Sequence, residues 1–310
     1  MAAIAHWDTD MTESLLVPEA ALPAATPSRG GRFRSFWRPF LQSRMGPLGL
    51  AILATVAVAA ILAPVIAADG PFALGGPRLA PPGTAGHLLG TDHLGRDMLA
   101  QIVYGARVSL VIGLVAASIS LVIGVLVGSI AGYYGGWADI LLSRLTDMFL
   151  IIPAFFLIII VVATLGSGIV YVMIVIGLTA WPTSARLMRA QALSLRDRTF
   201  VQALRALGES SPRILVRHII PNGIQPLIAN ASLDIASAIL IEAGLSFIGL
   251  GDPNQATWGR MIFDGRTTIT TAWWASVFPG VAIIVTVLGF YLVGDGISYV
   301  LSPRNRRQKS

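Results

Sequence analysis

Six long apolar stretches constrain the fold of this chain more than any other feature of its sequence. They lie at about 46–68, 107–131, 146–166, 168–187, 224–250 and 277–300. A helix that crosses the hydrocarbon core of a bilayer needs roughly 20 mostly apolar residues. Only 12% of the 310 residues are charged, against about 25% in typical soluble domains. The sequence therefore predicts an all-α membrane protein with six transmembrane helices.

Glycine and proline set the expected limits of these spans. Residues 166–168 (Gly-Ser-Gly) leave room only for a tight hairpin between the third and fourth spans. The fourth span is expected to end at Trp181 and Pro182, because proline lacks a backbone donor for the helix. The second span carries small residues that permit close helix packing, against this chain or another one: Gly113, Gly124, Gly128 and Gly132.

Arginine gathers in alternate connections between the spans. The chain before the first span carries five arginines with no acid among them: Arg29, Arg32, Arg34, Arg38 and Arg44. The connection between the fourth and fifth spans and the C-terminal tail are also basic, whereas the loops at 69–106 and 251–276 are nearly neutral. The positive-inside rule then predicts that both termini and residues 188–222 are cytoplasmic. The loops at 69–106 and 251–276 are expected outside.

The scarcity of lysine and the lack of cysteine exclude several kinds of chemistry. Lys309 is the only lysine and has no glycine-rich loop before it, whereas a P-loop needs a lysine that reaches the nucleotide phosphates. We therefore expect any ATP that drives this chain to be bound by another chain. Without cysteine there are no disulfides or thiolate ligands, and the spacing of His87 and His93 does not favour a metal site. The net charge of +6 needs no nucleic-acid partner.

Residues 199–222, TFVQALRALGESSPRILVRHIIPN, are amphipathic in an otherwise apolar chain. Thr199 and Gln202 match a capping box, and Gly208 is expected to end the helix that they begin. Helical spacing predicts one apolar face, formed by Phe200, Ala203, Leu204 and Leu207.

A second short helix is expected to follow. Ser211 and Pro212 are typical of a helix start, and Pro221 is expected to end it. Arg213 and Arg217 would share its polar side. The apolar face of the pair either packs on this chain's own helix ends or on lipid headgroups, or it enters a groove on another protein.

Polar groups inside the fifth span indicate a second candidate site. Asn230, Asp234 and Ser237 fall on one stripe of a helix. They either line a translocation path, with Asp234 facing water or a peptide amine, or form hydrogen bonds between helices. Glu242 lies off this stripe and is expected to be structural, bonding the backbone near residues 249–251.

Two further polar pairs are predicted from their spacing. Arg144 and Asp147 are three residues apart on one helix, which favours a local ion pair over a proton relay. In the loop before the second span, Thr91 or Asp92 is expected to cap a short helix, with Arg96 paired to Asp92.

Residues 199–221 resemble the cytoplasmic EAA loop of ABC-importer permeases, whose pattern is E-A-A-x-x-x-G with a proline further on. Ala203, Gly208 and Pro221 match that pattern, whereas Gln202 and Leu204 replace its glutamate and second alanine. In the family this loop is a coupling helix that docks in a cleft of the ATPase subunit. The resemblance implies the same role here for Phe200, Gln202, Ala203, Leu204, Leu207, Gly208 and Pro221.

Other stretches are similar to the dipeptide/oligopeptide subgroup of these permeases, at 87–110, 242–251, 257–262, 271–280 and 291–304. Together they indicate the C-type permease subunit of a peptide importer, with the type I importer fold. The resemblance divides the chain into a largely disordered cytoplasmic tail (1–44), a first transmembrane helix with its extracytoplasmic loop (45–104), a core permease domain (105–301) and a basic cytoplasmic tail (302–310).

The resemblance also implies partners and a location. The partners are a second permease subunit, two ATP-binding subunits, membrane lipid and an extracytoplasmic substrate-binding protein, which the loop around Asp92 could contact. ATP and Mg²⁺ would bind the ATPase subunits, and this chain would hold no cofactor and catalyse no reaction. The location would be the bacterial inner membrane. The alternatives are a stand-alone secondary transporter, a membrane scaffold, or an importer permease for a nickel chelate or haem.

Overall fold

The computed structural model describes residues 37–301, and from Pro39 onward they form one compact unit. Of the tail predicted at 1–44, residues 1–36 lie outside the described residues, and residues 37–42 are helical. The tail predicted at 302–310 also lies outside the described residues. The elements are α2 (Met45–Ile61), α3 (Ala63–Ile66), α4 (Met98–Tyr134), α5 (Gly136–Ile151), α6 (Ala154–Leu165), α7 (Ile169–Arg196), α8 (Thr199–Ala206), α9 (Ser211–Ile214), the π-helical turn η2 (Leu215–Ile219), α10 (Ile220–Gly223), α11 (Gln225–Phe247), α12 (Trp258–Gly265), the 3₁₀ turn η3 (Arg266–Thr268) and α13 (Trp274–Leu301). Within residues 37–301 the extended pairings are isolated bridges, so the all-α prediction is confirmed for that part.

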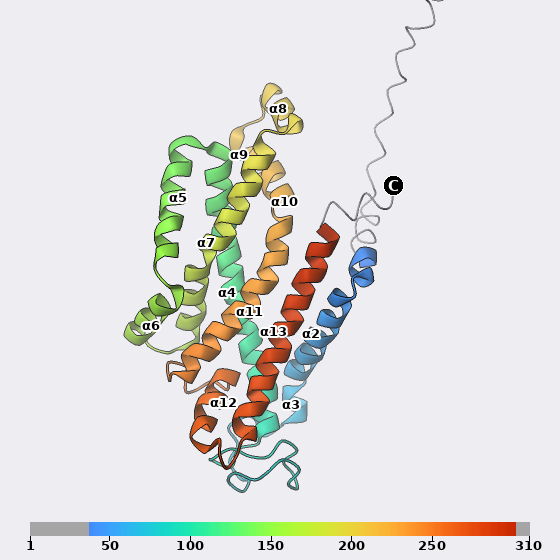
Figure 1. Cartoon of the computed structure of the whole chain (residues 1–310), viewed down its shortest axis with the longest axis vertical. Helices are drawn as coiled ribbons and strands as arrows, with labels where there is room; N and C mark the ends of the chain where they lie inside the picture. The colour runs from blue at the N-terminus through green and yellow to red at the C-terminus, as the bar shows by residue number, and fades with distance from the viewer. Residues whose placement is uncertain (1–36, 302–310) are drawn as a thin grey trace, which may run out of the picture. The chain divides into compact units, whose positions relative to one another are not determined.

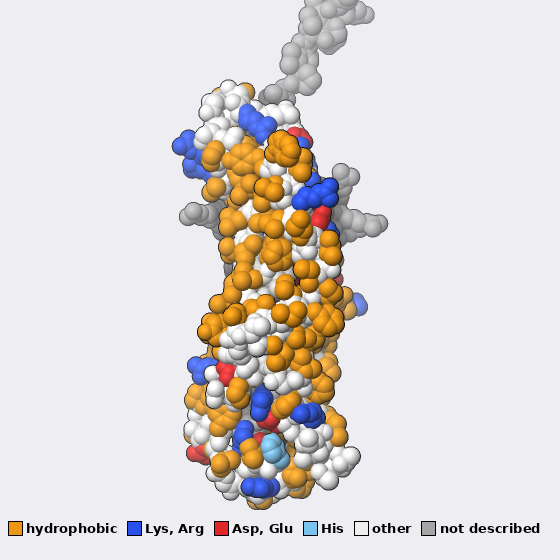
Figure 2. All heavy atoms as spheres, turned by 90° about the vertical axis from the view of Figure 1, so that its left-hand side faces the viewer, with side chains coloured by type: hydrophobic (Ala, Val, Ile, Leu, Met, Phe, Trp, Pro, Cys, Tyr) orange, Lys and Arg blue, Asp and Glu red, His pale blue; other side chains and the backbone are white. Residues whose placement is uncertain are grey.

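Four helices of the described chain are long and apolar enough to cross a membrane: α4, α7, α11 and α13. The pair α5 and α6 passes the same test together, and α2 is apolar but shorter, with 17 residues. Each of the six predicted apolar stretches therefore falls on helix. Seen from the side of α5 and α6, apolar side chains cover the middle of the unit, and charged side chains gather toward its two ends (Figure 2).

The two ends differ in their elements (Figure 1). The α8 end holds α8–α10, the start of α2 and the end of α13. The α12 end holds α3, α12 and the loop 67–97. The predicted grouping of loops, with 188–222 on one side and 69–106 and 251–276 on the other, matches this arrangement.

The third predicted span, 146–166, is wrong as a single straight helix. The chain breaks at Ile152 and Pro153, where α5 and α6 meet at a bend of 80°. Ile152 has an extended backbone, the conformation that a residue before proline prefers. Pro153 therefore ends α5 and starts α6 in a new direction. The hairpin predicted at 166–168 is present, between α6 and α7.

The fourth span was predicted too short, because α7 continues through Trp181 and Pro182 to Arg196. Pro182 removes one backbone donor, which packing against neighbouring helices can tolerate, and both Trp181 and Pro182 are buried. One unbroken helix therefore leads almost to the start of α8.

The glycines of α4 form a close contact with α7. A Cβ atom at Gly128 would collide with the carbonyl oxygen of Ala185, and Gly124 and Gly132 lie equally close to α7. Gly113 makes a similar contact with α11. The predicted small-residue packing is confirmed, and its partners are helices of this chain.

The loop 67–97 is anchored through the residues that precede α4. Arg96 pairs with Asp92 at 3.8 Å, as predicted. The predicted cap is wrong, because Asp97 is the residue that caps α4, accepting from the Ala100 amide at 2.8 Å. Asp92 instead accepts from the backbone amides of the turn itself, including that of Arg96 at 2.9 Å. The Asp92 carboxylate, which was predicted to cap a helix, therefore stabilises the turn instead.

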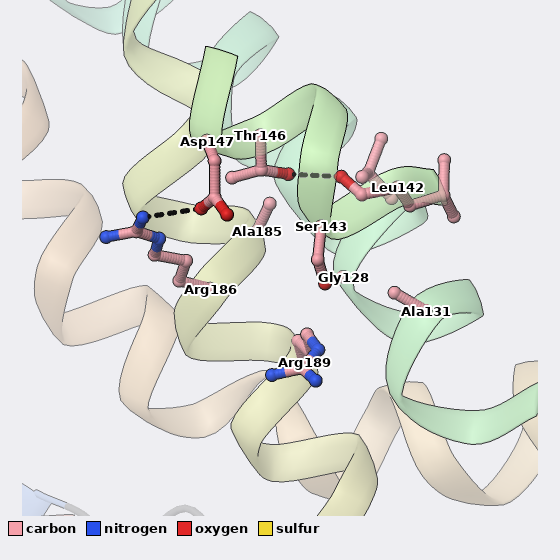
Figure 3. A pocket seen from close by; sticks show the side chains of 10 residues that line it. Gly128, Ala131, Leu142, Ser143, Thr146, Asp147, Ala185, Arg186 and Arg189 are labelled. Atoms are coloured by element: carbon pink, nitrogen blue, oxygen red, sulfur yellow. Dashed lines mark hydrogen bonds and ion pairs between the residues drawn. The ribbon is translucent and has the colours of Figure 1, made fainter. Parts of the chain in front are cut away.

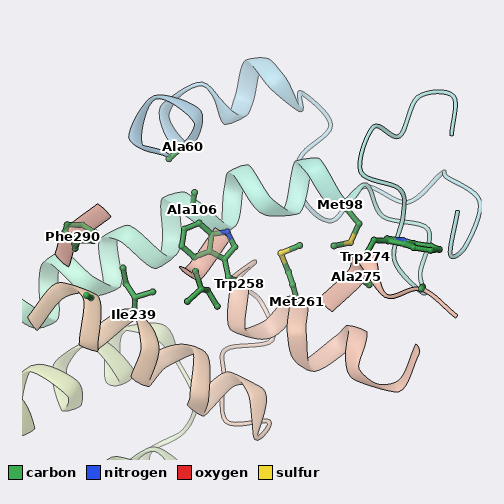
Figure 4. Close-up of a cluster of buried hydrophobic side chains, with 12 residues drawn as sticks. Ala60, Met98, Ala106, Ile239, Trp258, Met261, Trp274, Ala275 and Phe290 are labelled. Carbon is green, nitrogen blue, oxygen red and sulfur yellow. The ribbon is translucent and has the colours of Figure 1, made fainter. Parts of the chain in front are cut away.

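A buried cluster joins α2, α4, α11, α12 and α13 at the α12 end (Figure 4). Trp258 is almost fully buried in it, and its indole donates to the carbonyl of Ile102 at 3.0 Å. Trp274 likewise donates to the carbonyl of Thr91 at 3.0 Å. These two bonds tie α12 and α13 to α4 and its preceding loop, so the α12 end is fixed by large side chains with satisfied polar atoms.

Candidate functional site

Helix α8 follows α7 after only two residues, but it does not begin with the predicted capping box. Arg198 is the N-cap, and no side chain caps the helix. The carbonyl of Arg198 accepts from the amides of Val201 and Gln202 at 2.9 and 3.2 Å. Thr199 lies inside the first turn, and the Gln202 side chain donates back to the carbonyl of Asp197 at 3.3 Å. The helix therefore starts one residue earlier than the box requires.

The end of α8 confirms the expected role of Gly208. Its φ of +81° is left-handed, a conformation that suits glycine. The Gly208 amide donates to the carbonyl of Arg205 and the Glu209 amide to that of Leu204, both at 3.0 Å. This pair of bonds is the Schellman motif, which satisfies free carbonyls and turns the chain sharply.

The apolar residues of α8 fall on two faces, not one. Val201 is fully buried and Leu204 is partly buried, in a cluster with the ends of α4 and α7. Phe200, Ala203 and Leu207 are exposed, and Leu207 is 83% exposed. The predicted single face was wrong at Leu204, which packs inward. One side of α8 thus packs on its own chain, as the first alternative expected, and the other side is open.

The inward side of α8 is also held by a cation–π contact. The Arg205 guanidinium lies 5.2 Å from the ring centre of Tyr133, at the end of α4. Together with Val201, this contact fixes α8 against the bundle. We call the open side, formed by Phe200, Ala203, Ala206 and Leu207, the α8 face.

The second helix begins near Ser211, but Pro221 does not end it. Residues 211–223 run through α9, η2 and α10, with Pro221 near the start of α10. The π-helical turn η2 widens the helix just before this proline. Arg213 and Arg217 are exposed on its outer side, as predicted.

The polar groups of the fifth span are brought together in part. Asp234 accepts from the Asn230 amide at 3.1 Å and from the Ser184 hydroxyl of α7 at 3.3 Å. Ser237 is exposed instead of joining this group. The contact with Ser184 is a hydrogen bond between helices, which was one of the two alternatives for this group, but spacing within one span could not identify Ser184 as the partner.

Asp147 pairs with a residue that sequence spacing missed. Its carboxylate bonds Arg186 of α7 at 2.7 Å (Figure 3), and Arg144 is exposed with no ion pair among residues 37–301. The predicted local pair is therefore wrong. A second pair joins Asp139 of α5 to Arg189 of α7. The partners are 39 and 50 residues apart in the sequence, so no local pattern predicts these pairs.

Glu242 is buried and structural in its contacts, but its partners differ from the prediction. One carboxylate oxygen accepts from the Ser246 hydroxyl at 2.6 Å and from the Thr257 hydroxyl at 2.8 Å. Thr257 is also the N-cap of α12, accepting from the Arg260 amide. Glu242 thus links α11 to α12 through hydroxyl groups, and not to the backbone near 249–251.

An apolar helical bundle with an open apolar face on α8 and no P-loop of its own fits a permease subunit of an ABC transporter. The chain belongs to the family of binding-protein-dependent transport system inner membrane components, whose model matches residues 124–307. Residues 31–82 match a model described as the N-terminal transmembrane domain of oligopeptide transport permease C. As a member of this family it is a multi-pass membrane protein that works in complex with other ABC transporter subunits. ATP hydrolysis belongs to the ATPase subunits, and the chain is not itself an enzyme.

Similar proteins extend over most of the chain. A dipeptide transport system permease protein of Alkalihalophilus pseudofirmus is 37% identical over 306 residues, covering 96% of this chain and 98% of the relative. An oligopeptide transport system permease protein of Mycobacterium bovis is 38% identical, covering 87% of this chain and 94% of the relative.

The fold also resembles a solved structure. A chain of the MetNI methionine ABC transporter, in an inward-facing conformation, matches with a TM-score of 0.53 and 20% identity. The match covers 66% of this chain and 97% of that chain. At this identity the likeness concerns the fold alone, and the fold it supports is that of an ABC transporter permease.

Proposed function

We propose that this chain forms half of the translocation pathway of an ATP-driven importer of di- and oligopeptides in the bacterial inner membrane. The observation that carries the proposal is the exposed α8 face on a helix that is otherwise anchored to the bundle. An apolar helix face of this kind fits a groove on another protein. Family membership and the lack of a P-loop make an ATPase subunit the partner that this face suits.

The proposed topology has six spans and both termini in the cytoplasm. The described helices supply four spans, a fifth from the bent pair α5 and α6, and a sixth from α2 with α3. Most arginines of the described loops and helix ends lie toward the α8 end: Arg186, Arg189, Arg196, Arg198, Arg205, Arg213 and Arg217. This imbalance favours a cytoplasmic α8 end and an extracytoplasmic α12 end.

The proposed assembly contains a second permease, two ATPase subunits and an extracytoplasmic substrate-binding protein. ATP and Mg²⁺ would bind the ATPase subunits. Movement of those subunits would displace α8 and switch the pathway between its inward-open and outward-open states. The docking residues remain Phe200, Gln202, Ala203, Leu204, Leu207, Gly208 and Pro221, with Leu204 acting from the inward side.

Peptides are the proposed substrate because relatives named for dipeptide and oligopeptide transport match most of the chain. The same relatives argue against a nickel chelate or haem, and family membership argues against a stand-alone secondary transporter or a scaffold.

Reconstitution tests the proposal directly. The permease is purified with its co-expressed partner subunits and placed in proteoliposomes, and uptake of a labelled dipeptide is measured with and without ATP. We expect uptake only with ATP, the ATPase subunits and the binding protein present. Uptake that follows an ion gradient without ATP, or transport of a metal chelate in place of peptide, would refute it.

Asp234 provides a test of the pathway itself. We propose that Asn230, Asp234 and Ser237 line the path, with the Asp234 charge attracting a peptide amine. Asp234→Asn keeps an oxygen that can accept from Ser184 but removes the charge. Uptake should fall about tenfold, the effect of one lost hydrogen bond to a charged group. The yield of folded complex should be unchanged.

Ser184→Ala is the matched control for Asp234→Asn. It removes the bond between α7 and α11 and keeps the charge. If Ser184→Ala lowers uptake as much as Asp234→Asn does, or if Asp234→Asn transports normally, Asp234 serves only to join helices.

A further inference from the structure

Helix α5 is weakly held to the bundle by apolar contacts. Of its 16 residues, all of them described, only Thr146 is buried. Most of its large apolar side chains point away from the rest of the chain, with Trp137 85% and Ile151 79% exposed. Phe149 is an exception, because its ring packs edge-on against Trp181 of α7 with ring centres 5.3 Å apart. This limited apolar contact leaves much of the attachment of α5 to α4 and α7 to polar contacts.

Two ion pairs supply that attachment. The Arg189 guanidinium bonds both carboxylate oxygens of Asp139, at 2.5 and 2.7 Å, which is the bidentate geometry that fixes orientation. Arg186 bonds Asp147 at 2.7 Å, two turns further along α5. Both arginines lie on α7, so two separated points define the angle of α5 as well as its distance.

A cleft of about 310 Å³ separates α5 from α4 and α7 between these two points (Figure 3). Small residues form its α4 and α7 walls, including Gly128, Ala131 and Ala185, and the hydroxyl of Ser143 faces it from α5.

The contact of α7 with α4 is of the opposite kind. At Gly128 the backbone of α4 lies against the backbone of α7 with no space for a Cβ atom, so α4 and α7 are expected to move together. Helix α7 in turn ends two residues before α8. A displacement of α8 therefore reaches α4 and α7 through packing, whereas across the cleft it reaches α5 through the long polar side chains of Arg186 and Arg189.

We infer that Arg186 and Arg189 are positioning residues that make α5 follow α7 when α8 is displaced, and that transport requires both ion pairs. This inference rests on the proposed function, because it assumes that the ATPase subunits displace α8. It assigns a role in coupling to charges that lie outside the α8 face and outside the Asp234 group.

Charge exchange tests the inference in the complete reconstituted transporter. The variants are Asp139→Asn, Arg189→Gln, and the exchange of Asp139→Arg with Arg189→Asp. The readouts are dipeptide uptake, ATP hydrolysis and their ratio. Each single variant should lower uptake per ATP about fivefold, in line with a partly exposed pair worth about 1 kcal/mol. The exchange should restore the ratio to within about twofold of the unmodified complex.

Arg144→Gln is the control, since Arg144 lies on α5, is exposed and has no ion pair in the described chain. It should leave the ratio unchanged. Single variants that keep a normal ratio would overturn the inference, as would an exchange variant that stays as impaired as the singles although the complex assembles. Failure of the proposed function is a separate outcome, because the unmodified complex would then show no ATP-dependent uptake.

Discussion

Leu207→Asp should abolish ATP-driven uptake while leaving the fold of the permease intact. Leu207 is 83% exposed in this chain, so a charge there is solvated and should alter stability by no more than about 0.5 kcal/mol. In a docked complex the same carboxylate would be buried in an apolar groove. Loss of one central apolar contact at an interface costs about 2 kcal/mol or more, roughly a 30-fold loss in affinity.

The measurement is recovery of ATPase subunits with the tagged permease, together with uptake and thermal stability. We expect normal yield and thermal midpoint of the permease, little ATPase subunit bound, and no uptake. Unchanged recovery of the ATPase subunits would show that the α8 face is not the docking site.

Val201→Asp is the matched control from the other side of the same helix. Val201 is fully buried against the ends of α4 and α7, so a carboxylate there would be removed from water. Burying such a group costs several kcal/mol, roughly 3 or more, so this variant should unfold the α8 end or fail to accumulate. Aspartate at position 207 thus tests docking, and aspartate at position 201, six residues earlier, tests folding.

Gly208→Val is expected to have the second-largest effect. Gly208 holds a left-handed φ of +81° at the end of α8, and a residue with a Cβ pays about 1–2 kcal/mol in that region, more when it is β-branched. The Schellman bonds should be lost, the exit from α8 should change direction, and uptake should fall at least about tenfold. The permease should still be recovered from the membrane, since the strain is confined to an exposed turn.

Two further substitutions at Gly208 separate backbone strain from contact with a partner. Asparagine tolerates the left-handed region, so Gly208→Asn should retain most of the uptake. In this chain a Cβ at Gly208 meets no atom within 4 Å. Gly208→Trp adds strain and bulk, and if it loses more ATPase subunit than Gly208→Val does, the partner approaches closely here. Equal uptake by Gly208→Val and the unmodified protein would contradict the assigned role of the turn.

The apolar pattern was sufficient to locate the four long apolar helices among residues 37–301, although it reached only the end of α5, because the length of an apolar stretch is a property of consecutive residues. The continuity of those helices was not predictable in the same way. Pro153 breaks the helix while Pro182 does not, although the same ring removes the same donor. The difference lies in the surroundings, since Pro182 is buried against other helices and Pro153 is exposed.

The candidate sites show the same limit. Gly208 could be assigned from sequence because its role is set by backbone conformation within one turn. The partner of Asp147 could not, because Arg144 and Arg186 both carry the required charge and only the packing of α5 on α7 decides between them. The inward turn of Leu204 depends likewise on where the ends of α4 and α7 lie.

The contact between α4 and α7 also limits how this permease can change over evolutionary time. Most tight helix contacts can absorb a larger residue when a neighbouring side chain shrinks in compensation. At Gly128 the obstacles include the carbonyl oxygen of Ala185 and the amide nitrogen of Arg189, the latter 2.9 Å from an added Cβ. Main-chain atoms cannot be shortened by mutation. Second-site suppressors of a substitution at Gly128 should therefore be rare near that position. The contact between α4 and α7 should be the part of the molecule that tolerates substitution least.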